Sequence, residues 1–180
     1  MKELSLHLLD IAQNSVTAGA TKLTLSLIEH SGVLTMMVAD NGCGMTEEFL
    51  RQVMDPFTTT RTTRKVGMGL PLLRLSAEQA SGSLQVESAP GVGTTTTALF
   101  HTHDIDCPPL GDLAGCLSLF LQGAPPTLET RYIHETDAGR FELDTRELKA
   151  ILGDDVPLST PDVILWLQDY IAEHEAALTT

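Results

Sequence analysis

Asp10 and Asn14 are the first two side chains whose types and spacing suit chemistry on a bound phosphate. Because they are four residues apart in a segment with helical apolar periodicity, both face the same side of one helix. An Asn amide oxygen is a hard ligand for Mg²⁺ held on phosphates, and a carboxylate one turn away can orient or deprotonate a water. The alternative is an exposed polar stripe on an amphipathic helix, and the pair alone does not decide between the two.

Three glycine signatures follow this helix in a fixed order. They are residues 40–45 (Asp-Asn-Gly-Cys-Gly-Met), 67–70 (Gly-Met-Gly-Leu) and 91–95 (Gly-Val-Gly-Thr-Thr). One glycine pair would carry little information. Three in this order describe a nucleotide site assembled from separate parts of one sheet and helix layer, so the sequence predicts ATP as the ligand.

Asp40 comes directly after an apolar strand, where its carboxylate can accept a hydrogen bond from an adenine amino group. Gly42 and Gly44 let the backbone turn sharply and approach a ligand without Cβ clashes. Thr94 can close the adenine end with its hydroxyl. The alternatives are an ordinary Asp-Asn-Gly turn and, for Thr94, plain strand propensity.

Gly67 and Gly69 precede a helix start, where free backbone N–H groups bind phosphate. Arg61, Arg64 and Lys65 form a small cationic cluster just before them, suited to the terminal phosphates. The alternatives are a flexible hinge for the glycines and a solvated loop for the cations.

His7 lies three residues before Asp10 and on the same face as Asn14. We expect it to line or edge the pocket. A phospho-acceptor role is disfavoured for two reasons. Neither an Arg nor a Pro follows His7 as expected after a phospho-acceptor histidine, and no helical hairpin precedes it.

Alternating and helical periodicities predict the elements that position these residues. Thr46 is the predicted N-cap of the second helix, and Pro71 suits the first turn of the third. The predicted helices span 4–17, 46–54 and 70–80, and the predicted strands span 21–29, 33–39, 83–88 and 94–100.

Residues 101–109 are predicted to link this part to a separate unit of about 70 residues. That unit is expected to hold a helix near 110–121, a hairpin of 128–135 and 139–144, and helices near 145–152 and 160–176. The predicted domains are therefore 1–103 and 104–180.

Composition limits the partners. The net charge of −13 argues against a general nucleic-acid binder and against an anionic membrane surface. Three cysteines without a Cys-x-x-Cys pair argue against zinc, and an odd number without a signal peptide fits a reducing cytoplasm. The most apolar later stretch, 113–121, is too short to span a bilayer.

Together these segments resemble the GHKL superfamily of DNA gyrase, Hsp90, histidine kinases and MutL. The resemblance covers about residues 4–100 and rests on Asp10-Ile-Ala-Gln-Asn14, DNGCGM (40–45), DPFTTT (55–60), GMGL (67–70) and APGVGTTTT (89–97). It implies an α+β fold: a two-layer α/β sandwich of the Bergerat type, with a mixed sheet covered by helices on one face and a small C-terminal α+β extension.

The resemblance also implies roles for individual residues. Asn14 would hold Mg²⁺, Asp40 would bind adenine with support from Thr94, and Asp10 stands where relatives place a catalytic Glu. Residues 58–66 would form a short ATP lid. The remaining nucleotide contacts would come from Gly42, Gly44, Met45, Arg61, Lys65, Gly67, Met68, Gly69 and Leu70.

Asp10 departs from the family pattern because it is one methylene shorter than Glu, and a misplaced catalytic group can cost on the order of 100-fold in rate. Residue 71 is also a Pro where many histidine kinases have another Gly, which a first helical turn tolerates. Nucleotide binding is therefore a firmer expectation than hydrolysis.

The expected function is a cytoplasmic, Mg·ATP-binding regulatory protein that lacks its own phospho-acceptor domain. It could act as an anti-sigma-type protein Ser/Thr kinase or a weak ATPase. The alternatives are a non-catalytic nucleotide-responsive module and a degenerate scaffold acting through residues 104–180. The whole chain also resembles small bacterial proteins encoded near iron-hydrogenase genes, which suggests a protein partner in hydrogenase or electron-transfer systems; a homodimer stays open.

Overall fold

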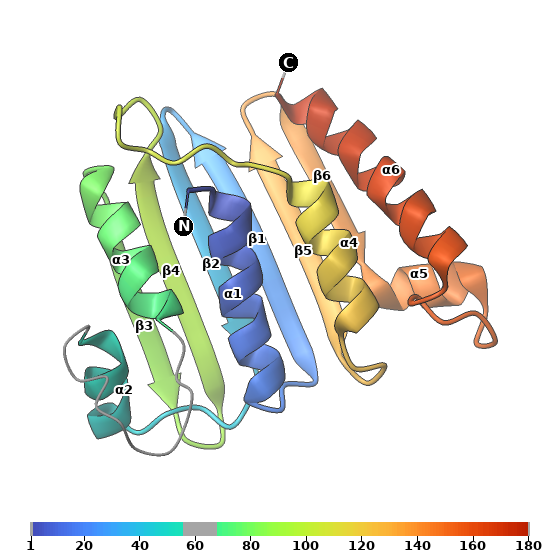
Figure 1. The fold of residues 1–180 in the computed structure, drawn as a ribbon, viewed down its shortest axis with the longest axis horizontal. Helices are drawn as coiled ribbons and strands as arrows, with labels where there is room; N and C mark the ends of the chain where they lie inside the picture. The colour runs from blue at the N-terminus through green and yellow to red at the C-terminus, as the bar shows by residue number, and fades with distance from the viewer. Residues whose placement is uncertain (1, 56–67, 180) are drawn as a thin grey trace.

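The computed structural model describes residues 2–55 and 68–179, which contain six helices and six strands (Figure 1). The helices are α1 (Leu4–Thr17), α2 (Glu47–Met54), α3 (Gly69–Gln79), α4 (Leu113–Gly123), α5 (Thr145–Leu152) and α6 (Pro161–Leu178). The strands are β1 (Lys22–His30), β2 (Val33–Asp40), β3 (Ser83–Ala89), β4 (Gly93–His101), β5 (Glu129–Thr136) and β6 (Gly139–Asp144).

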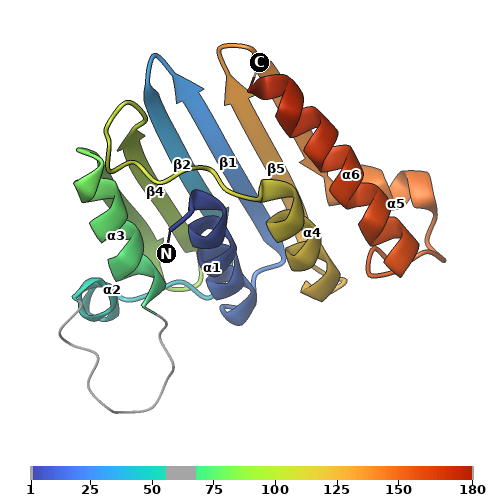
Figure 2. The ribbon, with the colours of Figure 1, turned by 45° about the horizontal axis from the view of Figure 1, so that its top comes forward.

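The strands form one mixed sheet in the order β3-β4-β2-β1-β5-β6. β1 pairs with β5 in parallel, and the other neighbouring strands pair antiparallel. Helices α1, α3, α4 and α6 lie over one face of the sheet (Figures 1 and 2). The predicted α+β class with a Bergerat-type two-layer arrangement is confirmed.

Strand alternation places the apolar side chains between the two layers. Leu23, Leu25 and Leu27 of β1 are each at most 2% exposed, and so are Leu4 and Leu8 of α1. Burying one such side chain stabilises the fold by about 1.5–3 kcal/mol. This shared core fixes α1 against the centre of the sheet.

The predicted second helix begins as its sequence indicates. Thr46 is the N-cap of α2, and its Oγ1 accepts a hydrogen bond of 3.2 Å from the Phe49 N–H. Glu47 and Glu48 lie in the first turn, where the helix dipole favours negative charge. None of the residues of α2 is fully buried, so α2 lies at the margin of the fold.

The C-terminal residues continue the N-terminal sheet. β5 lies along β1 with Tyr132 opposite Leu25, and α4 packs beside α1 and α6 (Figure 1). The sheet and the core therefore run across the predicted boundary between residues 103 and 104. A separate role for residues 104–180 stays a prediction.

The connection between β4 and α4 also holds the start of α1. The backbone N–H groups of Leu4 and Ser5 donate to the carbonyls of Pro109 and Leu110, at 2.9 and 2.8 Å. The first N–H groups of a helix have no partner within the helix, so these bonds satisfy two of them. The position of α1 thus depends on residues beyond β4.

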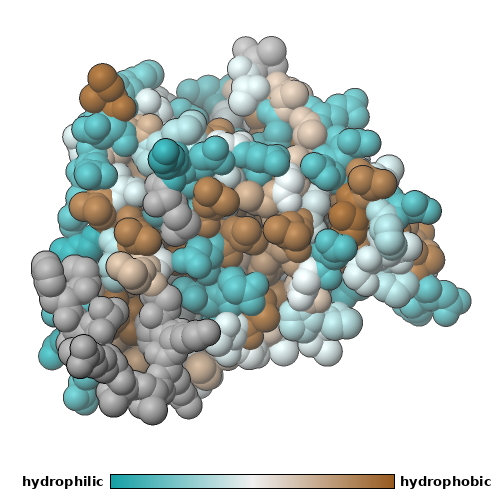
Figure 3. All heavy atoms as spheres, viewed as in Figure 1, coloured by the Kyte–Doolittle hydropathy of each residue, from teal (hydrophilic) through white to brown (hydrophobic). Residues whose placement is uncertain are grey.

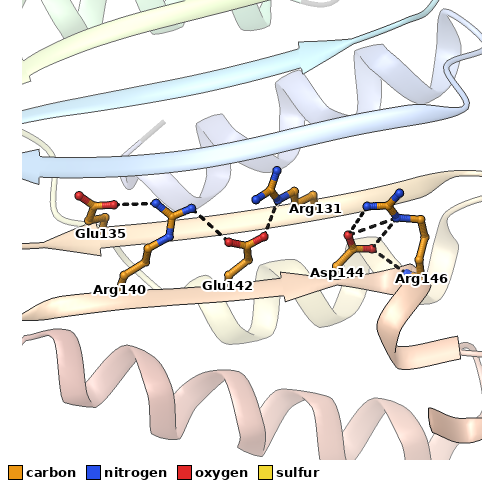
Figure 4. A network of polar contacts seen from close by, with 6 residues as sticks. All are labelled: Arg131, Glu135, Arg140, Glu142, Asp144 and Arg146. Carbon is orange, nitrogen blue, oxygen red and sulfur yellow. Dashed lines mark hydrogen bonds and ion pairs between the residues drawn. The ribbon is translucent and has the colours of Figure 1, made fainter. Parts of the chain in front are cut away.

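The opposite face of the β5–β6 hairpin carries a chain of ion pairs (Figure 4). Arg140 bridges Glu135 and Glu142, and Arg131 also pairs with Glu142. Asp144 is only 7% exposed and is bound by the Arg146 guanidinium, which holds the pKa of this carboxyl below its usual value. On this face of the hairpin, Glu135, Glu142 and Asp144 are each neutralised by arginine.

The helix-bearing surface mixes polar and apolar residues, with apolar atoms gathered near its middle over α1 and α4 (Figure 3). Leu6 of α1 and Leu119 of α4 are 39% and 61% exposed. Among the described residues, no helix combines the length and apolar character needed to cross a bilayer.

Candidate functional site

Asp10 and Asn14 lie on α1 as predicted, with Asp10 half-buried and Asn14 exposed. The Asp10 carboxylate lies against Gly69, the first residue of α3, so closely that a Cβ at position 69 would overlap Oδ2. Burial raises the pKa of Asp10 above its ordinary value. Asp10 of the Asp10–Asn14 helix therefore meets the Gly-Met-Gly-Leu signature at Gly69.

Asp40 ends β2 and is held by two neutral donors. The Ser15 hydroxyl donates to Oδ2 at 2.6 Å, and the Gly42 N–H donates to Oδ1 at 2.8 Å. Ser15 is 2% exposed and projects from α1. We call the meeting point of Asp10, Ser15, Asp40, Gly42 and Gly69 the α1–β2–α3 corner.

The loop after Asp40 is fixed against the turn between β3 and β4. The Gly91 N–H donates to the Cys43 carbonyl at 2.8 Å. Gly44 has a φ of +67°, and a Cβ there would overlap the Ala89 carbonyl, so this close approach requires glycine. The first glycine signature (40–45) is thus held in one shape by the turn that carries the third signature (91–95).

Thr94 lies opposite Asp40 in the β2–β4 ladder. Its hydroxyl is 2.8 Å from the Ser88 hydroxyl, which also accepts from the Met45 N–H at 2.8 Å. Thr94 and Met45 therefore meet through Ser88 on the same side of the sheet as Asp40. Neither Ser15 nor Ser88 was predicted as a site residue. For Ser15, the sequence did contain a signal, namely a polar residue on the inward face of the helix next to Asn14. For Ser88, the sequence contained no comparable signal.

Met68 is exposed, whereas Leu70 is 5% exposed and belongs to the core. At Leu70 the backbone is the part that can approach a ligand, since the side chain packs inward. Arg61, Arg64, Lys65 and Gly67, together with the predicted lid at 58–66, lie outside the described residues.

The expected position of His7 at the pocket edge is wrong. Its side chain is fully buried between α1 and α3, where Nε2 is 3.0 Å from the Ser76 hydroxyl. Burial lowers the pKa of His7 to about 4. His7 lies on the buried face of α1, where its ring contacts Ser76 of α3. It therefore joins two helices and does not line an open site.

The corner has the features a nucleotide needs at two separated points. An oriented carboxylate at Asp40 suits an amino group, and the start of α3 beside Asp10 is a helix N-terminus, the kind of position at which backbone N–H groups bind phosphate. Asp10 and Ser15 are five positions apart on α1, which separates these points by about 7.5 Å along the helix axis. The exposed Asn14 amide lies one turn beyond Asp10 and suits Mg²⁺. Within residues 2–55 and 68–179, no group of three or more His, Cys, Asp or Glu side chains is arranged to hold a metal ion.

Comparison with known proteins agrees with this arrangement. The family described as Histidine kinase-, DNA gyrase B-, and HSP90-like ATPase matches residues 2–104, which is more than half of the chain. The chain therefore belongs to this family, and the predicted GHKL membership is confirmed.

Relatives among curated proteins are sensor kinases. The sensor protein EvgS of Escherichia coli O157:H7 is 32% identical over 102 residues, covering 53% of this chain and 8% of EvgS. The autoinducer 2 sensor kinase/phosphatase LuxQ of Vibrio cholerae is 33% identical over 101 residues, covering 52% of this chain and 12% of LuxQ. The histidine protein kinase DivJ of Caulobacter vibrioides is 31% identical over 101 residues, covering 54% of this chain and 17% of DivJ. The chain thus spans less than a fifth of the length of these relatives.

Proposed function

We propose that the protein binds Mg·ATP at the α1–β2–α3 corner and uses it in a regulatory role. The observation that carries this proposal is the Asp40 carboxylate, held by Ser15 and Gly42 at the end of β2 and close to the junction of Asp10 with α3. Membership of an ATPase family supports the choice of nucleotide.

In this proposal Asp40 accepts a hydrogen bond from the adenine amino group, and Thr94 supports that end. The backbone at Gly67, Met68, Gly69 and Leu70 approaches the phosphates, with Arg61 and Lys65, which precede α3 in the sequence, assisting. Gly42, Gly44 and Met45 shape the intervening wall. Asn14 would hold Mg²⁺, which would neutralise phosphate charge.

Asp10 is the proposed general base. Its raised pKa makes it a stronger proton acceptor than an ordinary exposed Asp, which suits deprotonation of an attacking hydroxyl. The hydroxyl oxygen would bond to the γ-phosphorus while the bond to the ADP oxygen breaks. With water as the nucleophile this is ATP hydrolysis, and with a Ser or Thr of a partner it is anti-sigma-type protein phosphorylation.

The proposed setting is the cytoplasm, with a protein partner that senses the nucleotide state. The resemblance to small proteins encoded near iron-hydrogenase genes makes hydrogenase or electron-transfer systems the first place to search. A homodimer is the alternative assembly, and neither nucleic acid nor a membrane is a proposed partner.

A non-catalytic nucleotide-responsive module is the second candidate. It is favoured by the short Asp10 side chain, which lies against Gly69 and so reaches less far than a Glu would. A degenerate scaffold acting through residues 104–180 is the third, and it predicts no nucleotide binding at all.

Calorimetric titration with ATP, ADP and GTP, with and without Mg²⁺, tests the proposal. We expect Mg²⁺-dependent binding that prefers adenine. Steady-state ATPase assays of the parent and of Asp10→Asn then separate the first two candidates, because the variant should lose turnover while still binding ATP. Absence of binding to every nucleotide would overturn the proposal and leave the scaffold.

A further inference from the structure

Ser15 is a buried hydroxyl placed where its only neighbours along the helix are apolar or exposed. Ala12 on the same inward side of α1 is fully buried, whereas the adjacent Asn14 is exposed. A hydroxyl removed from water is costly unless it is hydrogen-bonded, and Ser15 meets this need by donating to Asp40 Oδ2 at 2.6 Å. The bond joins two segments that lie 25 residues apart.

The two donors to Asp40 act on different oxygens. Ser15 binds Oδ2, and the Gly42 N–H binds Oδ1. Each carboxylate oxygen accepts more than one hydrogen bond, so both keep accepting capacity for a ligand. The plane of the carboxylate is therefore set before any ligand arrives.

The chemical sense of these bonds restricts what Asp40 can recognise. A backbone N–H can only donate, and the Ser15 hydroxyl spends its hydrogen on Oδ2. Both oxygens of Asp40 are thus acceptors, which suits a ligand amino group and opposes a ligand carbonyl at the same position.

We infer that Ser15 is the specificity-determining positioning residue of the site, selecting nucleotides with a 6-amino purine over those with a 6-oxo purine. This inference rests on the proposed function, because it takes Asp40 as the purine contact. Ser15 acts through Asp40 and does not itself touch the ligand.

ATP and inosine triphosphate make the sharpest pair of probes, since at position 6 one carries an amino group and the other an oxygen. Removing the hydroxyl in Ser15→Ala releases Oδ2 and lets the carboxylate turn. The ATP contact is weakened, whereas inosine triphosphate has no hydrogen-bond donor at position 6 to lose. We expect the dissociation constant for inosine triphosphate divided by that for ATP to fall about tenfold. This is the typical effect of losing one hydrogen bond with a charged group.

Ser5→Ala is the matched control, because Ser5 is also fully buried on α1 but lies ten residues away from Ser15. It should leave the ratio unchanged. Ser15→Thr keeps the hydroxyl and should restore the ratio toward the parent value, which a purely packing role of the side chain would not predict. Thermal unfolding of each variant checks that the fold is kept.

The outcomes separate this inference from the proposed function. If the parent binds neither nucleotide, the proposed function fails. If the parent prefers ATP and a folded Ser15→Ala variant keeps the full preference, the role of Ser15 is overturned while nucleotide binding stands. If Ser15→Ala does not fold, the Ser15→Thr ratio decides: retention of the preference supports the inference, and its loss in a folded variant overturns it.

Discussion

Carboxylates at the α1–β2–α3 corner and on the β5–β6 hairpin are held by different kinds of donor. At the α1–β2–α3 corner, Asp40 is bound by a hydroxyl and a backbone amide, so its negative charge is oriented but not neutralised. On the β5–β6 hairpin, Glu135 and Glu142 are each paired with arginine (Figure 4). A carboxylate already paired with a guanidinium has little left for a ligand, whereas one held by neutral donors is prepared to bind.

The comparison also separates architecture from chemistry. The hairpin contributes through β5, which completes the sheet beside β1, and its exposed ion pairs add little because surface pairs contribute about 0–1 kcal/mol each. The corner contributes few core residues, but it gathers the side chains that can bind a ligand or take part in a reaction. Substitutions at the corner should therefore change ligand binding, whereas changes to the hairpin should affect the stability of the fold.

The largest expected effect follows from removing residues 108–180. Truncation would uncover the edge of β1 and the side of α1, and would remove the Pro109 and Leu110 carbonyls that hold the start of α1. We expect the truncated chain to show no cooperative unfolding transition by circular dichroism. The free energy contributed by the lost core packing exceeds the roughly 5–15 kcal/mol that stabilises a typical domain. A well-dispersed NMR spectrum with intact ATP binding would show that the C-terminal residues are a docking unit.

Asp40→Asn should reduce ATP affinity by tenfold to on the order of 100-fold, since hydrogen bonds to charged groups contribute about 1.5–3 kcal/mol. The fold should be kept. Glu142→Gln makes the same carboxyl-to-amide change on the hairpin and should leave affinity unchanged. Calorimetry on both variants measures the contrast, and equal ATP affinity in Asp40→Asn and the parent would refute the assignment of the adenine contact.

His7 provides a pH test within the N-terminal region. Its pKa falls from 6.5 to about 4 on burial, so the unfolded chain binds more protons between these values. This side chain therefore makes stability fall as pH drops from 6.5 towards 4. Urea unfolding across that range should show a shallower pH dependence in His7→Gln. An unchanged slope would mean that the imidazole is not kept neutral by burial.

His30 should show the opposite sign and the smallest effect. Its ring nitrogens lie 2.9 Å from Asp137 and 3.1 Å from Glu135, and these hydrogen bonds raise the pKa of His30. The added stability is therefore present below the ordinary value and is lost as pH rises through the raised pKa. NMR titration of the His30 ring should give a lower pKa in Asp137→Asn than in the parent, with little change in melting temperature because the pair is exposed.

Local pattern predicted most of the elements, since α1 spans the expected residues and Thr46 caps α2 as expected. The parallel pairing of β1 with β5 was not predicted, because periodicity reports which face of a strand is buried but not which distant strand lies beside it. The same limit explains Ser15, whose role depends on Asp40 across the fold. His7 was misplaced because a polar residue on an apolar helix face gives no sign that a distant Ser76 satisfies it.

The site assignments divide in the same way. Motif spacing predicted Asp10, Asn14, Asp40 and Thr94, and the structure brings Asp10 to Gly69 and Thr94 opposite Asp40. Their functional roles stay predictions, as do those of Arg61, Lys65 and Gly67, which lie outside the described residues.

The position of β5 next to β1 has a consequence for how the chain reaches this fold. Partners on these strands, such as Leu25 and Tyr132, are separated by roughly a hundred residues, and pairing between such distant segments slows folding. During synthesis the central strand must wait for the hairpin to leave the ribosome before its second edge is covered. We therefore expect the corner that carries Asp40 to mature late, after a period in which the nascent chain exposes an unpaired strand and depends on protection from aggregation.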